Sequence, residues 1–493
     1  MDAGDCTEHA FVDMPGGSAF DRGLAYAKQV AARENGTVAY LCKPNQRLPL
    51  PGEITRVTED EWSVGTLLSS LARLAGEDDV LVYAFADEPF LDAEITEKLI
   101  ADHRRYYAEY TFSEGRPGGT TPQVLSRRAL ETMLTIVKSP EDARARNSLF
   151  SVIEIDINRF DIETEIAPRD QALLRLSFNT KTKRDALLCS RFAAHEPAGA
   201  QELADLVEEK PELRRTLPAY VQVEIINGCP QACSYCPFPL FGGDILSNRD
   251  AMPLERFEEI AQAVARFAPS STLSVSLWGE PGLHPAIVDI VRLVDGMEEL
   301  SLLVETSGVG WSKEATAALA SAALDNTTWI VSLDALDPEH YRQVRGNGYE
   351  EAVRFAETFI EAYPASTYVQ AVRLRDYERL YPEFWKAWKE KTPNVIIQKY
   401  DHVSGKLPER KTTDLSPLTR LPCVHNQRDL VVRLDGTVPL CKEDINGERV
   451  LGNIFDDGIE AIWRAGETCF HEHISGAYKG LCIECDEYYT YNF

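Results

Sequence analysis

The sequence predicts an α/β protein built around an incomplete parallel β/α barrel. β-like runs and helical stretches alternate from about residue 216 to residue 410, and such alternation predicts a parallel sheet with right-handed crossovers. About six strand–helix units fit into this segment, too few for a closed eight-stranded barrel. Seven of the eleven cysteines fall into two spaced groups, one inside this segment and one after it, so metal centres are expected on the same scaffold.

Length and composition restrict the class of protein. At 493 residues, the chain is long enough for roughly two to four domains. It has no run of about 18 apolar residues, so no membrane span is expected. Its first residues lack the pattern of a secretory signal, so we expect a cytosolic, cytoplasmic protein. The net charge of −27 argues against a nucleic-acid substrate, since binding phosphates requires an excess of Lys and Arg.

Residues 1–150 have the pattern of a separate α/β domain, with strands expected at 37–42 and 79–90. The run that begins FADEPFLDAEITEKL resembles sugar-nucleotide cytidylyltransferases, and this nucleotidyltransferase-like pattern implies that Asp87 helps to hold Mg2+ and nucleotide. Such an enzyme needs a Gly-rich, basic phosphate loop after its first strand, but Gly17 stands where a lysine is usual. We expect a degenerate domain that has lost transferase activity; an active transferase is the alternative.

Residues 151–215 are expected to connect this domain to the barrel segment. At their end, the stretch LADLVEEKPELRRTLPAY (203–220) is predicted to form a helix that ends at Pro218.

Three cysteines, Cys229, Cys233 and Cys236, follow the first predicted strand of the barrel segment, at 221–226. Their spacing suits a [4Fe–4S] cluster with one open iron, whereas zinc normally takes four ligands and this run offers three. The spacing, with Tyr235 just before the third cysteine, resembles the signature of the radical SAM enzymes. The resemblance implies that the open iron binds S-adenosylmethionine, which one electron from the cluster cleaves to a 5′-deoxyadenosyl radical.

The resemblance also implies a partial (β/α)6 radical SAM barrel, whose further strands are predicted at 273–278, 300–305, 329–334, 368–374 and 394–400. Ligands of such folds sit at the C-terminal ends of the strands. The residues implied to bind S-adenosylmethionine are Tyr235, Gly279, Glu280, Pro281, Thr306, Ser307, Ser332 and Arg345. The Gly-Glu-Pro segment would hold the methionine amino group, and the arginine would match a carboxylate; a plain turn and a surface arginine are the alternatives.

The second cysteine group comprises Cys423, Cys441, Cys482 and Cys485. Four thiolates suit either tetrahedral zinc or a complete [4Fe–4S] cluster, and the spacing does not choose between them. An Asp-Gly turn at 435–436 predicts a β-hairpin that brings the first two cysteines together. The other cysteines are expected to be inert thiols: Cys6, Cys42, Cys189 and Cys469.

The layout of this group, with Gly-x4-Cys, a Gly-Asn-Ile…Ile-Trp segment and a final Cys-x2-Cys, resembles the SPASM/twitch extension of radical SAM enzymes in its shorter form. That resemblance implies one auxiliary [4Fe–4S] cluster with four cysteine ligands and a role in electron transfer; a structural staple is the alternative. The order of all the pieces resembles the spiro-SPASM family. The predicted division is residues 1–150, 151–215, 216–415 (the barrel) and 416–493 (the twitch-like iron–sulfur domain).

These resemblances imply a radical SAM oxidoreductase that receives electrons from a flavodoxin or ferredoxin-type reductant. The radical would abstract hydrogen from a sugar, polyol or nucleotide-linked substrate, and the auxiliary cluster would take up the electron. Two alternatives stay open: a radical SAM maturase of a ribosomal peptide, and a non-catalytic iron–sulfur and nucleotide-binding protein. The sequence names no general acid or base; near predicted strand ends, candidates to face substrate are Asp334, Arg373 and Tyr400.

Overall fold

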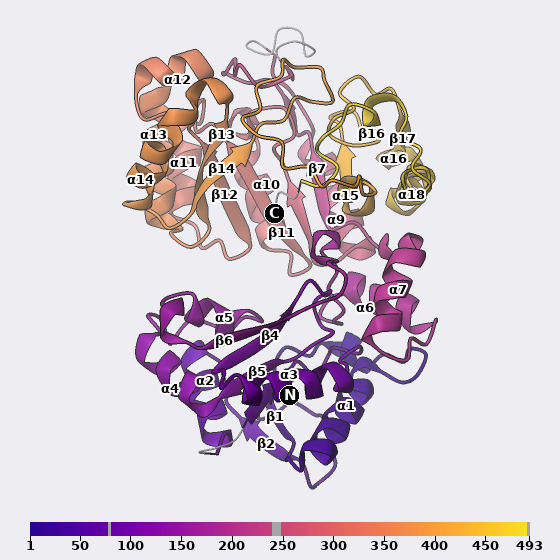
Figure 1. The fold of residues 1–493 in the computed structure, drawn as a ribbon. Helices are drawn as coiled ribbons and strands as arrows, with labels where there is room; N and C mark the ends of the chain where they lie inside the picture. Colours follow the sequence, from indigo (N-terminus) through magenta and orange to yellow (C-terminus); the bar gives the residue numbers. More distant parts are fainter. Residues whose placement is uncertain (77–79, 239–247, 491–493) are drawn as a thin grey trace. The chain divides into compact units, whose positions relative to one another are not determined.

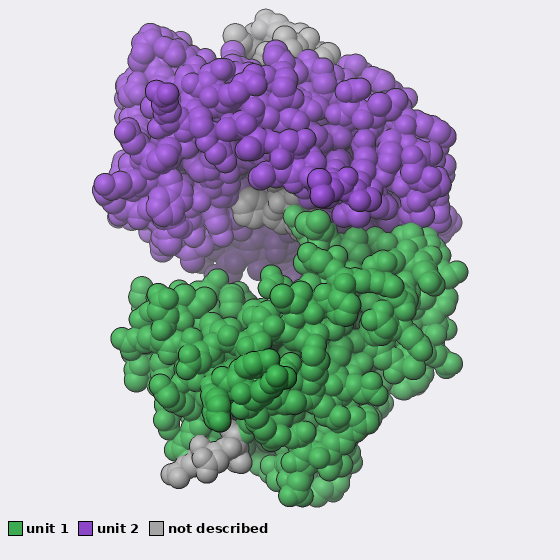
Figure 2. All heavy atoms as spheres, in the orientation of Figure 1, with its two compact units in different colours: residues 1–214 green, residues 215–493 purple. Residues whose placement is uncertain are grey.

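The computed structural model describes residues 1–76, 80–238 and 248–490, and the chain forms two compact units, Met1–Arg214 and Arg215–Phe493 (Figures 1 and 2). Each unit has a hydrophobic core of its own. Among the described residues, none of the helices has the length and apolar character that crossing a lipid bilayer requires.

A seven-stranded parallel sheet is the centre of the second unit, in the order β14-β13-β12-β11-β10-β7-β15 (Figure 1). The strands are β7 (Tyr220–Val223), β10 (Ser271–Ser274), β11 (Leu300–Thr306), β12 (Thr327–Ser332), β13 (Thr367–Arg373), β14 (Val395–Lys399) and β15 (Asp429–Val432). From β7 to β14 the strands lie in chain order, which confirms the predicted mixed α/β fold with a parallel sheet. β10 ends at Ser274 rather than at residue 278, so Gly279 and Glu280 lie in a loop and Pro281 begins a 3-10 turn.

Helices follow the strands and cover the sheet with their apolar faces. α9 (Leu254–Phe267) buries Phe257, Ile260 and Val264, which follow helical spacing. In Figure 1, α11, α13 and α14 lie outside the strands that they connect. The helices are α9 (Leu254–Phe267), α10 (Ile287–Asp295), α11 (Lys313–Ala320), α12 (Pro338–Val344), α13 (Tyr349–Ala362) and α14 (Tyr381–Lys389).

The strand β15 comes from the second cysteine region and was not predicted to join the barrel sheet. It pairs in parallel with β7, with Asp429 opposite Tyr220 and Val432 opposite Val223. The predicted β-hairpin is therefore wrong. Gly436 does make a turn, at a φ of 85°, but β16 (Thr437–Pro439) pairs with β17 (Val450–Asn453) in a separate antiparallel sheet. The successive residues Leu430 to Val432 are all buried, as expected of a strand covered on both faces rather than of an exposed hairpin.

Four short helices complete the C-terminal region: α15 (Val424–Arg428), α16 (Ile454–Asp457), α17 (Ile459–Ala465) and α18 (Glu467–Ile474).

The first unit contains a four-stranded mixed sheet and a smaller parallel pair. Its strands are β1 (Ala39–Cys42), β2 (Thr55–Thr58), β3 (Val80–Tyr83), β4 (Tyr110–Glu114), β5 (Gln123–Ser126) and β6 (Ile162–Ile166). Its helices are α1 (Ala19–Glu34), α2 (Val64–Leu74), α3 (Ala93–Arg105), α4 (Arg127–Ile136), α5 (Ser148–Ile153), α6 (Lys183–Ala193) and α7 (Ala200–Glu209).

The prediction that the last of these helices continues to Pro218 is wrong. α7 stops at Glu209, because Pro211 disfavours the α conformation at the residue before it.

Candidate functional site

A cavity of about 260 Å³ lies at the C-terminal ends of the parallel strands. It brings together nearly all of the residues predicted from the sequence to hold the first cluster and S-adenosylmethionine. Those that line it are Cys229, Cys233, Tyr235, Cys236, Gly279, Glu280, Thr306, Ser307, Ser332 and Arg345. Pro281 is buried in the single 3-10 turn that follows Glu280 and does not line the cavity.

The loop that carries the first three cysteines leaves from β8 (Ile226–Asn227), which pairs with β9 (Asp250–Ala251). The loop is held against the end of α12, because the backbone N–H groups of Ala232 and Ser234 donate to the carbonyls of Arg345 and Val344 at 3.1 and 2.8 Å. Three thiols on one side of a cavity with room beside them fit a cluster whose fourth iron is open. Burial raises the pKa of Cys236 to about 12, so metal binding must displace the thiol proton near neutral pH.

The carboxylate of Glu280, in the loop after β10, accepts hydrogen bonds from residues at the end of β11. Its Oε2 accepts from the backbone N–H and the hydroxyl of Ser307, at 2.9 and 2.6 Å. Its Oε1 accepts from Trp311 Nε1 at 3.1 Å and from the Thr306 hydroxyl. These hydrogen bonds hold the loop after β10 in position against the end of β11. The neighbouring position 279 requires glycine, because the Cβ of any other residue would lie 2.0 Å from the carbonyl oxygen of Ile226.

Arg345, which was predicted to bind a carboxylate of the cofactor, already contacts a carboxylate of the protein. Its Nη1 donates to Asp334 Oδ2 at 2.6 Å, and the Tyr235 hydroxyl donates to the same oxygen at 2.6 Å. Asp334 Oδ1 accepts from the backbone N–H of Val372 at 2.6 Å. The three side chains therefore form one polar group, with Arg345 and Asp334 buried and Tyr235 half-buried, that joins the cysteine loop to β13 and to the loop after β12.

The other residues that the sequence suggested near strand ends have mainly structural contacts. Arg373 pairs with Glu378, at 2.9 Å between Nε and Oε2, and does not line the cavity. Tyr400 lines the cavity, but its hydroxyl donates to the carbonyl of Pro408 at 2.6 Å.

Sequence reasoning missed Glu305 as a functional candidate. Its Oε1 accepts from Gln370 Nε2 at 2.8 Å and from the Ser332 hydroxyl at 3.2 Å, and the residue lines the cavity. Burial raises the pKa of this carboxyl, although both hydrogen bonds oppose the shift. Its place at the end of a strand was the available signal, but the partners come from two other strands and leave no local pattern.

A second cavity, of about 20 Å³, is lined by all four cysteines of the second group. Cys423 occupies the N-cap position of α15 without a side-chain capping bond, and the backbone carbonyl of Cys485 accepts from Arg420 Nη2 at 3.2 Å. Four converging thiols fit a fully ligated metal centre. Lys442 and Glu443, directly after Cys441, line both this cavity and the larger one.

Cys469 was expected to be an inert thiol, but the structure places it next to two other potential metal ligands. It is buried on α18, and its sulfur lies within 4.8 Å of the ligand atoms of His473 and Cys482. The Cys-x3-His spacing on a helix was a usable signal, because positions four residues apart share a helix face.

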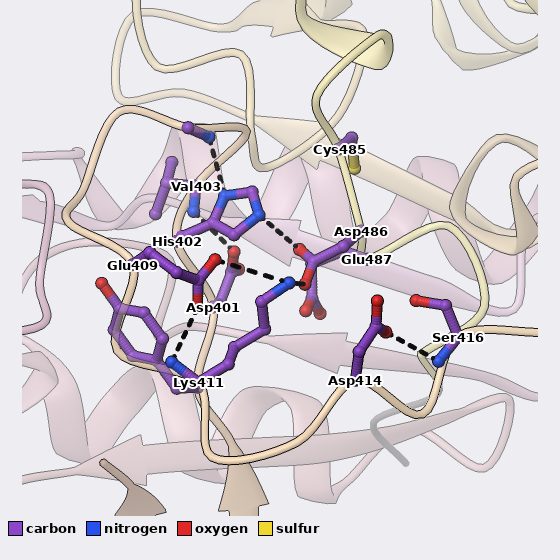
Figure 3. Close-up of polar contacts among 12 residues, drawn as sticks. Asp401, His402, Val403, Glu409, Lys411, Asp414, Ser416, Cys485, Asp486 and Glu487 are labelled. Carbon is purple, nitrogen blue, oxygen red and sulfur yellow. Dashed lines mark hydrogen bonds and ion pairs between the residues drawn. The ribbon is translucent and has the colours of Figure 1, made fainter. Parts of the chain in front are cut away.

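Charged residues tie the last cysteine pair to the loop after β14 (Figure 3). Asp486, next to Cys485, lies 2.7 Å from Lys411 Nζ, 3.0 Å from Lys399 Nζ and 3.2 Å from His402 Nε2. Its carboxylate also lies close to that of Asp401. The lysines supply the counter-charges, so we assign no metal ion to these acids. The contacts hold the second cavity against the strand end that lines the first.

Asp87, the predicted Mg2+ and nucleotide position of the first unit, is 1% exposed. Its Oδ2 pairs with Arg146 Nη2, and Arg146 Nη1 lies 3.2 Å from Glu88 Oε1. A carboxylate that is buried and neutralised in this way is poorly suited to bind a metal ion.

Two family models match the second unit. Residues 223–372 match the radical SAM superfamily, and residues 423–486 match the SPASM iron–sulfur cluster-binding domain. An uncharacterized protein of Treponema pallidum (strain Nichols) is 38% identical over 360 residues, which cover 70% of this chain and 98% of that relative. The fold, the site and these matches define a radical SAM enzyme. More particularly, the chain belongs to the SPASM-bearing members of the superfamily, whose cofactors are a [4Fe–4S] cluster that binds S-adenosylmethionine and an auxiliary cluster.

Several solved structures are similar to this chain. BtrN in complex with AdoMet and 2-DOIA matches at a TM-score of 0.37 and 20% identity, over 55% of this chain and 94% of that chain. Streptococcus suis SuiB matches at a TM-score of 0.45 and 16% identity, over 74% of this chain and 87% of that chain. Native anSMEcpe with bound AdoMet matches at a TM-score of 0.41 and 16% identity, over 55% and 87% of the two chains.

Proposed function

We propose that this enzyme oxidises a hydroxyl-bearing small molecule, namely a sugar, a polyol or a nucleotide-linked compound. In this proposal Cys229, Cys233 and Cys236 hold the cluster that binds S-adenosylmethionine. The auxiliary cluster is held by Cys423, Cys441, Cys482 and Cys485. When bound, the first cluster and its cofactor supply the 5′-deoxyadenosyl radical that removes a hydrogen atom from the substrate.

The observation that carries this proposal is the sharing of Lys442 and Glu443 by the two cavities. A substrate in the larger cavity would lie near the auxiliary cysteines, because Lys442 and Glu443 line both cavities. A hydroxylated carbon that has lost a hydrogen atom becomes a carbonyl by losing one further electron and the hydroxyl proton. The adjoining cavity supports passage of that electron to the auxiliary cluster, and the overall change is a two-electron oxidation.

The lining of the larger cavity also suits a hydroxylated substrate. Gln222, Gln398, Lys399 and Asp401 offer hydrogen-bond donors and acceptors there. We assign the role of proton acceptor to Glu305, whose orientation is fixed by Gln370 and Ser332. Burial raises its pKa, which makes this carboxylate a better proton acceptor than an exposed one.

The electron that starts each turnover must come from outside the chain. We propose a flavodoxin or ferredoxin-type reductant in the cytosol, where reducing conditions keep cysteines available for clusters.

Anaerobic incubation with S-adenosylmethionine and dithionite tests the proposal. We expect 5′-deoxyadenosine from the reconstituted enzyme and none above background from Cys229→Ala. The matched control is Cys42→Ala, a buried cysteine of β1 in the first unit, which should keep full activity. Absence of 5′-deoxyadenosine from the wild-type protein would refute the radical reaction.

The substrate class needs its own test. Deuterated sugars, polyols and sugar nucleotides should transfer deuterium to 5′-deoxyadenosine, with formation of a carbonyl product. Transfer from a peptide library and from none of the small molecules would instead support a peptide maturase.

A further inference from the structure

Cys469 lies beside the auxiliary cysteines although the proposed function gives it no role. It is 1% exposed, and it shares one face of α18 with His473, which is 3% exposed. With Cys482, these residues place three potential ligand atoms within 4.8 Å of one another. A buried group of two cysteines and one histidine is a combination typical of metal sites.

Hydrogen-bond donors surround the Cys469 sulfur and orient its lone pairs. Asn426 Nδ2 donates to this sulfur at 3.0 Å, and His473 Nε2 lies 3.7 Å from it. The backbone N–H of Cys423 points to the other ring nitrogen of His473 at 3.4 Å, which leaves the proton of a neutral ring on Nε2, facing the sulfur. Two N–H groups therefore face the sulfur, and His473 is better placed to orient it than to bind metal itself.

We propose that Cys469 is a reserve ligand of the auxiliary cluster, able to bind the iron that Cys482 otherwise binds. The Cys469 sulfur lies within 4.8 Å of the Cys482 sulfur, so an iron bound by Cys482 would lie near both sulfurs. In this exchange the bond from iron to the Cys482 thiolate would be replaced by a bond to the Cys469 thiolate, the proton of Cys469 would pass to Cys482, and no electron would be transferred. This inference rests on the auxiliary cluster of the proposed function.

The test isolates the auxiliary cluster. In a parent protein with Cys229, Cys233 and Cys236 all replaced by alanine, anaerobic reconstitution should give about four irons per chain. Cys482→Ala in this parent should keep most of that iron. Cys485→Ala is the matched control from the same Cys-x2-Cys pair and should lose most of it, as should Cys482→Ala combined with Cys469→Ala. The reduced Cys482→Ala protein should also show electron paramagnetic resonance g values shifted from the parent's.

Three results would overturn the inference: loss of iron from Cys482→Ala as complete as from Cys485→Ala, full retention in the double variant, or loss of iron from Cys469→Ala alone. Circular dichroism checks whether each variant is folded, and Cys482→Ser is a second variant whose side-chain volume is closer to that of cysteine. Cys469→Ala alone should keep about four irons; a loss there would make Cys469 an obligatory ligand rather than a reserve one. If the parent itself binds no iron, the auxiliary cluster of the proposed function fails as well, a result distinct from failure of Cys469 alone.

Discussion

Ser307 donates two hydrogen bonds to the carboxylate of Glu280, one from its hydroxyl at 2.6 Å and one from its backbone N–H at 2.9 Å. These bonds join the loop after β10 to the end of β11. Because of these bonds, the position of each residue depends on the other. Both residues are predicted to contact S-adenosylmethionine. The pair is therefore part of the mechanical support of the cofactor site as well as part of its lining.

Replacing Glu280 by alanine should weaken both the fold and cofactor binding. Glu280 is 3% exposed, and its removal takes away the acceptor of the Ser307 and Thr306 donors. Trp311 Nε1 keeps the Thr306 hydroxyl oxygen as an acceptor at 2.9 Å. We expect a loss of about 1–3 kcal/mol in the free energy of unfolding, measured by urea denaturation, and weaker binding of S-adenosylmethionine by calorimetry. Glu298→Ala, at an exposed position, is the control. Unchanged affinity in Glu280→Ala would contradict a supporting role.

Gly279→Ala should damage the same loop by a different route. The added Cβ would lie 2.0 Å from the carbonyl oxygen of Ile226, a backbone atom that cannot rotate away. We expect a destabilisation of about 1–3 kcal/mol or more and loss of 5′-deoxyadenosine formation. Gly52→Ala meets nothing within 4 Å of its new Cβ and should behave as wild type. Equal melting temperatures for the two variants would show that the loop shifts to accommodate the new Cβ, which would contradict the predicted clash.

Glu305→Gln should change how stability depends on pH. Burial raises the pKa of this carboxyl in the folded state, above an unfolded value of about 4.3. Its favourable contribution is therefore complete below the unfolded pKa and is lost as pH rises through the folded pKa. The variant should be more stable than wild type at neutral pH, with the difference disappearing in acid. Urea unfolding across this pH range measures the effect, and parallel curves for the two proteins would contradict it.

Iron content should report both clusters separately. The reconstituted wild-type protein should hold about eight irons per chain, and Cys233→Ala and Cys441→Ala about four each. Cys6→Ala, outside both cavities, should keep the wild-type content. Zinc in place of iron in the wild-type protein would refute both cluster assignments.

The first unit should not act as a cytidylyltransferase. Because Arg146 neutralises the buried Asp87, we expect no CTP-dependent pyrophosphate release. Arg146→Ala should destabilise this unit by about 3–5 kcal/mol, since it leaves buried carboxylates without their partner. Pyrophosphate release that disappears in Asp87→Ala would restore the transferase interpretation.

Local patterns in the sequence were sufficient for much of the site. The spacing of Cys229, Cys233 and Cys236 requires only that three thiols share a short loop. The alternation of strands and helices then places that loop and Glu280 at one edge of a parallel sheet. Both conclusions depend on neighbours in sequence, where periodicity and ligand spacing carry information.

The sequence by itself determined the parallel sheet, the two cysteine groups and the edge of the sheet where the cofactor residues meet. Tertiary structure alone decided that β15 pairs with β7 rather than with the next strand of a hairpin. The consecutive buried residues of β15 suit a strand that is covered on both faces of a parallel sheet. Tertiary structure also decided that Glu305 faces the cavity and that Cys469 lies beside Cys482. These relationships depend on packing between segments distant in sequence, and no local period or spacing encodes such contacts.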